Sequence, residues 1–398
     1  MTLNRRKFMQ TLGLLTVTIP NIGIGKEQNK ISNISAETPG FTIAPYIQNL
    51  TTNSISIQIL TNTNSYTWVE YGIEGFDHKF FASLHGLKVA NCRYFNFHLT
   101  NLVPGTTYKY RVHTKNIVKL AGYEVIYGDE IRTQEYKFTT PPLQKDSCEV
   151  IIYNDIHDRK ESFKHLWNLK QQQNTDLVFF NGDIFNQVST EQQVVNNFLK
   201  PINDLFSTQI PMVFNRGNHE TRGGFAREII NYFDYPNQLT YQAFELGPVF
   251  WICLDSGEDK TDASKEYFGL ADFDTLRLEQ RDWLQKIVKT KAFKKAKYRA
   301  VVMHMPPLHS GDWHGPTHCT ELFVPIFNAN KINIVYSGHT HKAIFHPPTD
   351  KNKFALLIGG APQDGKRTII DIKADQKTFT SKLIDDNGNL LHEYTIKP

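Results

Sequence analysis

The chain has 398 residues, of which 40% are hydrophobic and 21% charged, and its formal net charge is +4. This composition is that of an ordinary globular protein with room for two or three domains, and it excludes a collagen-like or largely disordered chain. The small net charge gives no strong signal for nucleic-acid binding. One basic cluster, residues 286–299, is interpreted as a solvated helix face rather than a phosphate-backbone patch. The sequence leaves the oligomeric state open.

The first 25 residues have the pattern of an export signal. Arg5 and Arg6 precede an apolar stretch, residues 12–24, that is too short to span a bilayer permanently. The paired arginines resemble the twin-arginine export signal, and an ordinary secretory signal or a retained tether is the alternative. We therefore expect an exported protein, periplasmic or secreted, with no membrane span after removal of the signal. Residues 26–39 are expected to be a linker.

The chain has four cysteines, none of which forms a Cys-x-x-Cys pair, and this argues against a cysteine zinc site. Cys253 lies in an apolar run and is expected to be a buried free thiol. A disulfide among Cys92, Cys148 and Cys319 is left open.

Residues 40–142 have the alternation of half-buried strands, for example in 54–59 and 108–112. Turn residues separate these runs, and about seven short strands in such a length predict a β-sandwich. No cluster of catalytic residue types occurs in this stretch, so we expect it to be an accessory domain.

Residues 147–350 alternate between short apolar runs and stretches of helical periodicity, which predicts a layered α/β domain. Helices are expected near 163–170, 194–205 and 276–288. Residues 351–398 return to alternating strands and are expected to complete this domain by finishing the second sheet of its core. The predicted fold class is thus an N-terminal β-sandwich followed by a two-sheet β-sandwich that is flanked by helices.

Five short polar blocks each follow one of the apolar runs. They are Asn-Asp-Ile-His-Asp (154–158), Asn-Gly-Asp (181–183), Arg-Gly-Asn-His-Glu (216–220), Met-His-Met (303–305) and Ser-Gly-His-Thr-His (337–341). Ligands of open α/β sheets bind beyond the carboxyl ends of the strands, so the blocks would bring carboxylates, imidazoles and an amide to one edge. Such oxygen and nitrogen donors suit Mn, Fe or Zn. The sequence therefore predicts a metal site.

The order of these blocks resembles the calcineurin-like metallophosphoesterase pattern of Asp-x-His, Gly-Asp, Gly-Asn-His-Asp/Glu, a lone His and Gly-His-x-His. The resemblance implies a small phosphorylated substrate and two divalent metal ions, Mn, Fe or Zn. The first ion would be held by Asp155, His157, Asp183 and His341. The second would be held by Asp183, Asn218, His304 and His339, with Asp183 bridging the two.

The resemblance also implies roles for residues that do not bind metal. A metal-bound hydroxide would attack the phosphate, and His219 would act as the general acid that protonates the leaving group. Asp158, Asn186 and Glu220 are candidates for orienting the imidazoles. Arg222 is a candidate for contacting phosphate oxygens, although an exposed loop arginine is the more ordinary interpretation. Residues 309–318 are interpreted as a substrate wall or an ordinary polar loop.

The amino-terminal stretch resembles the fibronectin III-like domain that precedes the catalytic domain of purple acid phosphatases. The resemblance rests on Pro-Tyr-Ile-Gln-Asn (45–49), Val-Glu-Tyr-Gly (69–72) and residues 99–108. Purple acid phosphatases have a metal-binding tyrosine where this chain has Asn186, and they lack a histidine equivalent to His157. We therefore expect a divalent pair of ions and activity nearer neutral pH, rather than a coloured ferric centre.

Taken together, these residues imply an exported binuclear metallophosphoesterase that hydrolyses phosphate monoesters. A phosphodiesterase that acts on nucleotides or phospholipid headgroups is the alternative among enzymes, because both reactions use the same in-line attack. From a different class, the protein would be a surface-binding protein with a vestigial hydrolase domain. A missing ligand would support that last hypothesis, and none of the ligand positions is missing.

Overall fold

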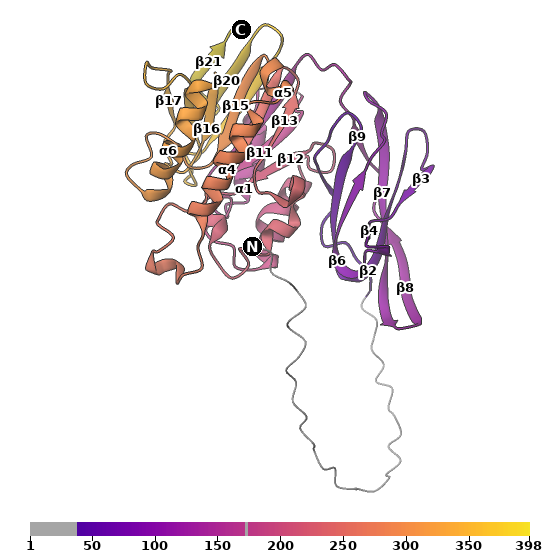
Figure 1. Ribbon diagram of the computed structural model, residues 1–398. Helices are drawn as coiled ribbons and strands as arrows, with labels where there is room; N and C mark the ends of the chain where they lie inside the picture. The colour runs from indigo at the N-terminus through magenta and orange to yellow at the C-terminus, as the bar shows by residue number, and fades with distance from the viewer. Residues whose placement is uncertain (1–37, 172–173) are drawn as a thin grey trace, which may run out of the picture. The chain divides into compact units, whose positions relative to one another are not determined.

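The computed structural model describes residues 38–171 and 174–398 (Figure 1). The predicted export signal and most of the predicted linker, residues 1–37, lie outside the described residues. Within the described residues, no helix has the length and apolar character that a membrane span requires.

The N-terminal β region is built around one long strand, β2 (Ile55–Gly72). The first part of β2 pairs with β6 (Ala90–Leu99), and the second part pairs with β7 (Thr107–Ala121). Apolar side chains from these three strands form most of the core of the region, together with Ile47, Leu102 and Phe138. The shorter strands are β1 (Tyr46–Gln48), β3 (His78–Phe80), β4 (Ser83–Leu84), β5 (Leu87–Lys88), β8 (Glu124–Arg132) and β9 (Tyr136–Thr139).

The following part of the chain contains two six-stranded sheets. The first sheet has the order β12 (Met212–Asn215), β11 (Leu177–Asn181), β10 (Cys148–Tyr153), β19 (Thr368–Ala374), β20 (Phe379–Asp385), β21 (Leu390–Ile396). The second sheet has the order β13 (Gln242–Leu246), β14 (Val249–Leu254), β15 (Tyr298–Met303), β16 (Ile334–Ser337), β18 (Ala355–Ile358), β17 (Ile344–His346).

A single apolar layer joins the two sheets. Val150 and Phe179 of the first sheet belong to the same buried cluster as Trp251 and Tyr336 of the second. Burial of apolar side chains from both sheets is the main force that holds such a sandwich together. The predicted two-sheet sandwich flanked by helices is therefore confirmed.

Helices pack on the outer faces of the sandwich. The first sheet is covered by α1 (Glu161–Leu169), α2 (Glu191–Val194), the π-helix η1 (Val195–Leu199) and α3 (Lys200–Asn203). The second sheet is covered by α4 (Phe273–Ile287), α5 (Lys291–Lys295) and α6 (His314–Ala329) (Figure 1). The remaining elements of the described residues are the 3-10 turns η2 (His219–Thr221), η3 (Ile229–Tyr232), η4 (Pro236–Gln238) and η5 (Lys265–Tyr267).

Two features of the fold differ from the sequence predictions. The strands of residues 351–398, which we expected to finish one sheet together, are divided: β18 lies in the second sheet, and β19, β20 and β21 extend the first sheet beside β10. An alternating apolar pattern shows that a strand has a buried face, but it does not specify the neighbouring strand. Helix α6 begins at His314, within the polar loop that we expected at 309–318. The helix was not predicted because it contains Pro316 and Pro325, and proline disfavours helix interiors.

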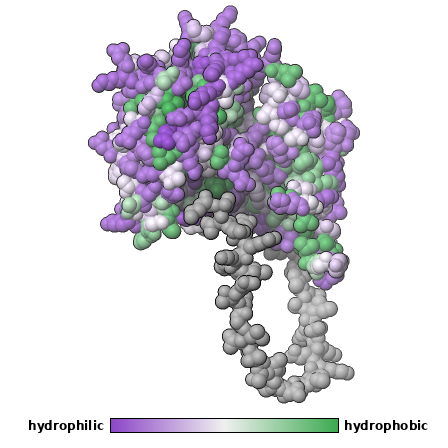
Figure 2. All heavy atoms as spheres, in the orientation of Figure 1, coloured by the Kyte–Doolittle hydropathy of each residue, from purple (hydrophilic) through white to green (hydrophobic). Residues whose placement is uncertain are grey.

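All four cysteines lie in the described residues and all are free thiols. Cys253 is buried in β14, as expected, and the disulfide that the sequence left open is not formed. The face of the molecule seen in Figure 2 is mostly hydrophilic, with apolar side chains in scattered patches.

Candidate metal centre

The five polar blocks meet because they follow strands that run in parallel. Strands β10, β11 and β12 are parallel neighbours in the first sheet, and β15 and β16 are parallel neighbours in the second. Carboxyl ends of parallel strands lie at the same edge of a sheet. The two sheets therefore present their loops to one shared site.

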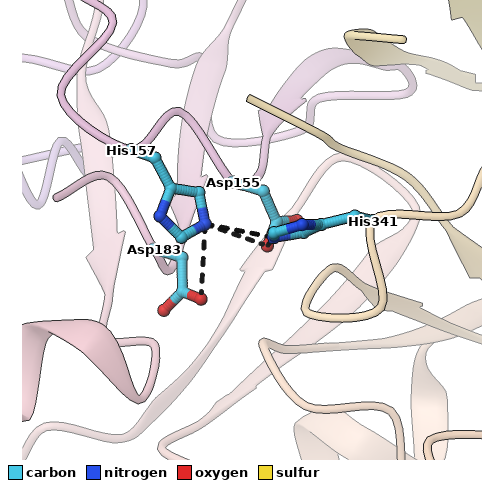
Figure 3. A group of neighbouring side chains, drawn as sticks. All are labelled: Asp155, His157, Asp183 and His341. Carbon is cyan, nitrogen blue, oxygen red and sulfur yellow. Dashed lines mark hydrogen bonds and ion pairs between the residues drawn. The ribbon is translucent and has the colours of Figure 1, made fainter. Parts of the chain in front are cut away.

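Four side chains form a first ligand group: Asp155, His157, Asp183 and His341, whose ligand atoms all lie within 4.8 Å of one another (Figure 3). His157 Nε2 lies 3.1 Å from His341 Nε2 and 3.8 Å from Asp183 Oδ2. His341 Nε2 lies 3.4 Å from Asp155 Oδ1. These are the same four residues that the sequence assigned to the first metal position.

A second ligand group lies next to the first and shares Asp183 with it. Ligand atoms of Asp183, His304 and His339 also lie within 4.8 Å of one another. His304 Nε2 is 3.1 Å from Asp183 Oδ2, and Asn218 Oδ1 is 3.1 Å from His339 Nδ1. The structure thus brings the members of the second predicted set together as well.

The spacing of these atoms fits metal ions. In tetrahedral coordination, a metal about 2.0–2.1 Å from each ligand atom separates neighbouring ligand atoms by about 3.3–3.4 Å. The separations given above, 3.1, 3.4 and 3.8 Å, lie around this value. The buried Nε2 of His304 faces Asp183 at 3.1 Å without hydrogen-bond geometry. Asn181 O accepts from Nδ1–H of His304 at 2.9 Å, which leaves the Nε2 lone pair directed at the site when the ring is neutral.

The electrostatics of the two groups show that the site attracts positive charge. Burial alone would lower the pKa of His304, but the charge of Asp183 raises it to about 10. Burial alone would raise the pKa of Asp183, but His304 holds it well below its usual range. Burial, together with His304, lowers the pKa of His339 to about 4, so this imidazole is neutral and able to bind metal at neutral pH.

Several of these residues have a left-handed backbone, which costs an ordinary L-residue about 1–2 kcal/mol. Positive φ values occur at Asp155 (53°), His157 (49°), Asp183 (52°), His339 (69°) and His341 (54°). Strained backbone of this kind persists where the surrounding structure enforces it, and it gathers at functional sites.

Two glycines of the blocks are required by close packing at the centre. A Cβ on Gly182, whose φ is +82°, would lie 2.5 Å from the His304 ring. A Cβ on Gly338 would lie 2.4 Å from Asp155 Oδ2. Real Cβ atoms do not approach other atoms this closely, so the Gly-Asp and Gly-His-x-His patterns each need their glycine.

Asn186 supports two histidines of the centre at once. Its side-chain Oδ1 lies 3.3 Å from His157 Nδ1, and its backbone carbonyl lies 2.6 Å from His219 Nδ1. Asp158 in turn accepts hydrogen bonds from the backbone N–H and the side-chain amide of Asn186, at 2.9 and 3.0 Å. Asn186 therefore contacts two imidazoles, whereas the carboxylate of Asp158 contacts Asn186.

Glu220 has a different role from the imidazole contact that we expected. Its buried carboxylate accepts hydrogen bonds from the backbone N–H groups of Asp183, Ile184 and Gly217, at 2.8, 2.8 and 2.7 Å. Burial and the charge of Asp183 raise the pKa of Glu220 to about 7. These bonds hold the loop that carries Asp183 against the loop that carries Asn218.

Arg222 is not an exposed loop arginine. Its guanidinium pairs with both carboxylate oxygens of the buried Glu258, with Nη2 at 2.9 Å from Oε2. Its Nη1 lies 3.2 Å from His219 Nε2. Glu258 was not predicted from the sequence, although the polar residues 255–258 follow the apolar run of β14 just as the five blocks follow their strands.

Three buried asparagines behind the centre were also missed. Asn181 donates to Asn154 Oδ1 at 2.9 Å, and Asn215 donates to Asn181 Oδ1 at 3.1 Å. The amide of Asn215 also donates to the backbone carbonyls of Leu254 and Val302, both at 3.1 Å. This row of amides joins the strand ends of the first sheet to those of the second. In the sequence, this row is visible as an asparagine that begins a block, at Asn154 and Asn181, or directly precedes one, at Asn215.

Comparison with known proteins identifies the class to which this site belongs. Residues 149–343 match the family model of calcineurin-like phosphoesterases. The chain thus carries a domain of the calcineurin-like phosphoesterase family, and it is a metal-dependent phosphoester hydrolase. The family resemblance that was inferred from the five blocks is confirmed.

Solved structures that share the fold of this chain include the following two. One is the purple acid phosphatase PPD1 from seeds of yellow lupin (Lupinus luteus), with a TM-score of 0.65, 14% identity, and coverage of 90% of this chain and 74% of that chain. The other is PhoD, with a TM-score of 0.58, 12% identity, and coverage of 90% and 89%. Comparison with curated proteins finds no match. At these identities the likeness concerns the fold.

Proposed function

We propose that this chain hydrolyses phosphate monoesters at a centre of two divalent cations, with His219 as the general acid. The observation that carries the proposal is the pair of ligand groups that share Asp183, with His219 Nε2 only 3.8 Å from Asp183 Oδ2. Asp155, His157, Asp183 and His341 would hold one cation. Asp183, Asn218, His304 and His339 would hold the other.

Divalent cations in such a site, for which the donor set suits Mn, Fe or Zn, supply a nucleophilic water at neutral pH and offset the charge of the phosphate. The buried carboxylates of Asp155 and Asp183 balance part of the positive charge. Asp155 also accepts from the backbone N–H of His339 at 3.0 Å, which fixes the loop of that ligand.

His219 is placed to transfer a proton at a defined atom. Its Nδ1–H donates to the carbonyl of Asn186, so Nε2 is the atom that would carry the proton to the leaving group. The side chain is 26% exposed and therefore within reach of a substrate. Arg222 Nη1 lies 3.2 Å from the same Nε2, and because a guanidinium only donates, it would hold the ring while Nε2 is unprotonated; Glu258 fixes the guanidinium. We propose that Arg222 positions His219 rather than binding phosphate directly.

A panel of esters with matched leaving groups tests the substrate class. With the metal-loaded protein, we expect monoesters to be hydrolysed with a kcat/KM at least tenfold above that of the corresponding diesters, a difference of about 1.4 kcal/mol. Alkyl and aryl phosphates, nucleotide diesters and phospholipid headgroup diesters form the panel. Preference for the diesters would contradict the monoester proposal and favour a phosphodiesterase at the same centre. Absence of turnover on every ester would favour a surface-binding role.

We also propose that residues 1–25 direct export and are followed by a linker, residues 26–39. Residues 40–142 would be an accessory domain of the fibronectin III type, residues 147–350 the phosphoesterase domain, and residues 351–398 the strands that complete it.

Replacing both Arg5 and Arg6 by Lys is expected to leave active enzyme inside the cell, because a twin-arginine pathway requires the arginine pair. The distribution of the enzyme is measured as hydrolase activity in the cell fraction and in the exported fraction. Unchanged export of the double variant would indicate a general secretory signal.

A further inference from the structure

A second cluster of metal-binding residue types lies outside the centre described above. It consists of Asp274 in the first turn of α4, and of His314 and His318 at the start of α6. The ligand atoms of the three residues all lie within 4.8 Å of one another. His314 and His318 are four positions apart, a spacing that places two side chains on one face of a helix.

The contacts of this cluster converge on one carboxylate. His314 Nε2 lies 2.8 Å from Asp274 Oδ1 and 3.0 Å from Oδ2. His318 Nδ1 lies 3.0 Å from Oδ1. Two imidazole nitrogens and one carboxylate therefore face a common point, an arrangement that zinc sites with two histidines on a helix also use.

A third nitrogen approaches the same oxygen. Arg277 Nη1 lies 2.9 Å from Asp274 Oδ1, so that atom faces three potential donors although a carboxylate oxygen offers only about two lone pairs. A cation that took the two imidazole lone pairs and Oδ2 would leave Oδ1 to Arg277 alone. Arg277 is fully buried and also donates to Ser256 O at 2.9 Å, so it is a fixed partner for the carboxylate.

We propose that Asp274, His314 and His318 form a further divalent-cation site, of the zinc type, that joins the beginnings of α4 and α6. The side chains are 38%, 35% and 16% exposed, respectively, so an ion can enter and water can complete its coordination. The imidazole and carboxylate set with an open position suits tetrahedral Zn²⁺.

This site binds zinc more weakly than the two-cation centre. It has one carboxylate, whose charge is already offset by Arg277, and it lies near the positive ends of two helices. The two-cation centre instead has two buried carboxylates. The zinc of this site is accordingly the first to be removed by a chelator.

The site is connected to the general acid through a chain of contacts. Arg277 Nη2 donates to the backbone carbonyl of Glu258, and Gly315 N donates to Asp259 O at 2.8 Å. Glu258 holds Arg222, which in turn contacts His219. Zinc bound at the new site therefore stabilises residues 258–259, and the side chain of Glu258 in turn holds Arg222.

Zinc binding to the purified full chain tests the proposal. The protein is dialysed against micromolar zinc, and bound zinc is counted by elemental analysis in wild type, in His314→Ala/His318→Ala and in a control, His392→Ala. We expect the double variant to hold one zinc fewer than wild type and the control to equal wild type. The measured quantity is the difference in zinc content between wild type and variant. Zinc bound at the two-cation centre contributes equally to both and cancels. Equal zinc in wild type and double variant would overturn the proposal.

Two further measurements keep the test decisive if the double variant folds poorly. Asp274→Asn keeps the shape of the side chain and an acceptor for Arg277, but removes the charge, and it is expected to lose the same single zinc. Added zinc should raise the melting temperature of the wild type, since a ligand that binds the native state stabilises it, and this increment should be smaller in Asp274→Asn. An unchanged zinc count and an unchanged increment in Asp274→Asn would also overturn the proposal.

Discussion

Asp183→Ala protein is expected to lose cations from both positions of the centre and to lose most of its hydrolytic activity. Asp183 is the one residue shared by the two ligand groups, and its carboxylate is almost fully buried among His157, His304 and His219. Without this anion the second group has no carboxylate, and the first group keeps only that of Asp155. The loss in kcat/KM should exceed the roughly 10–100-fold that is typical for a residue that only supports a metal ligand.

Metal content and kinetics of the same preparation measure this effect. Asp183→Asn is the companion variant, because it keeps the size of the side chain and separates loss of charge from loss of packing. Asp204→Ala, at an exposed position, serves as the matched control and should retain both cations and activity. Full occupancy of both cation positions in Asp183→Ala would rule out the bridging role.

The positions of the ligand groups could be predicted because local and global patterns agree. Each block directly follows an apolar run, and an apolar run of that kind forms a buried strand. Parallel strands bring their carboxyl ends to one edge of a sheet, so Asp155 and Asp183 were expected to lie together in the first sheet, and His304 and His339 in the second. Three of the five blocks contain a glycine, Gly182, Gly217 and Gly338, and the close approach of each to the centre explains its place.

The supporting residues could not be predicted in the same way. Glu258 contacts Arg222 at the end of η2, and Asn215 contacts the carbonyl of Leu254 on β14, so both act through distant segments whose placement depends on which strands lie side by side. Sheet order is set by the packing of whole apolar faces, which a single strand pattern does not contain. The same limit explains why β18 and β19 were expected in one sheet and lie in two.

Residues 309–318 show a second kind of limit. Gly315 and Pro316 are poor helix formers in isolation, and the sequence was interpreted there as a loop. In the structure they occupy the first turn of α6, where proline is tolerated because the N–H groups have no helical partner. Tertiary packing of Phe323 and Phe327 against the second sheet then stabilises the helix.

His219→Ala is expected to keep both cations while turnover of esters with poor leaving groups slows by roughly 10²–10⁴-fold, the usual contribution of a general acid. The variant keeps the backbone N–H that donates to Asp183 Oδ1 at 3.0 Å, so the bridging carboxylate remains held. His165→Ala, which alters a histidine on α1, is the matched control and should behave as wild type.

The dependence on leaving group distinguishes proton transfer from a general disturbance of the site. An alkoxide leaving group needs a proton as it departs, whereas a nitrophenolate is stable as an anion and needs none. Because Nε2 of His219 is the atom that would carry this proton, the defect of His219→Ala should be large for alkyl phosphates and small for nitrophenyl phosphate. Equal slowing across the series, with both cations retained, would mean that His219 acts on substrate position or on Asp183 rather than on the leaving group.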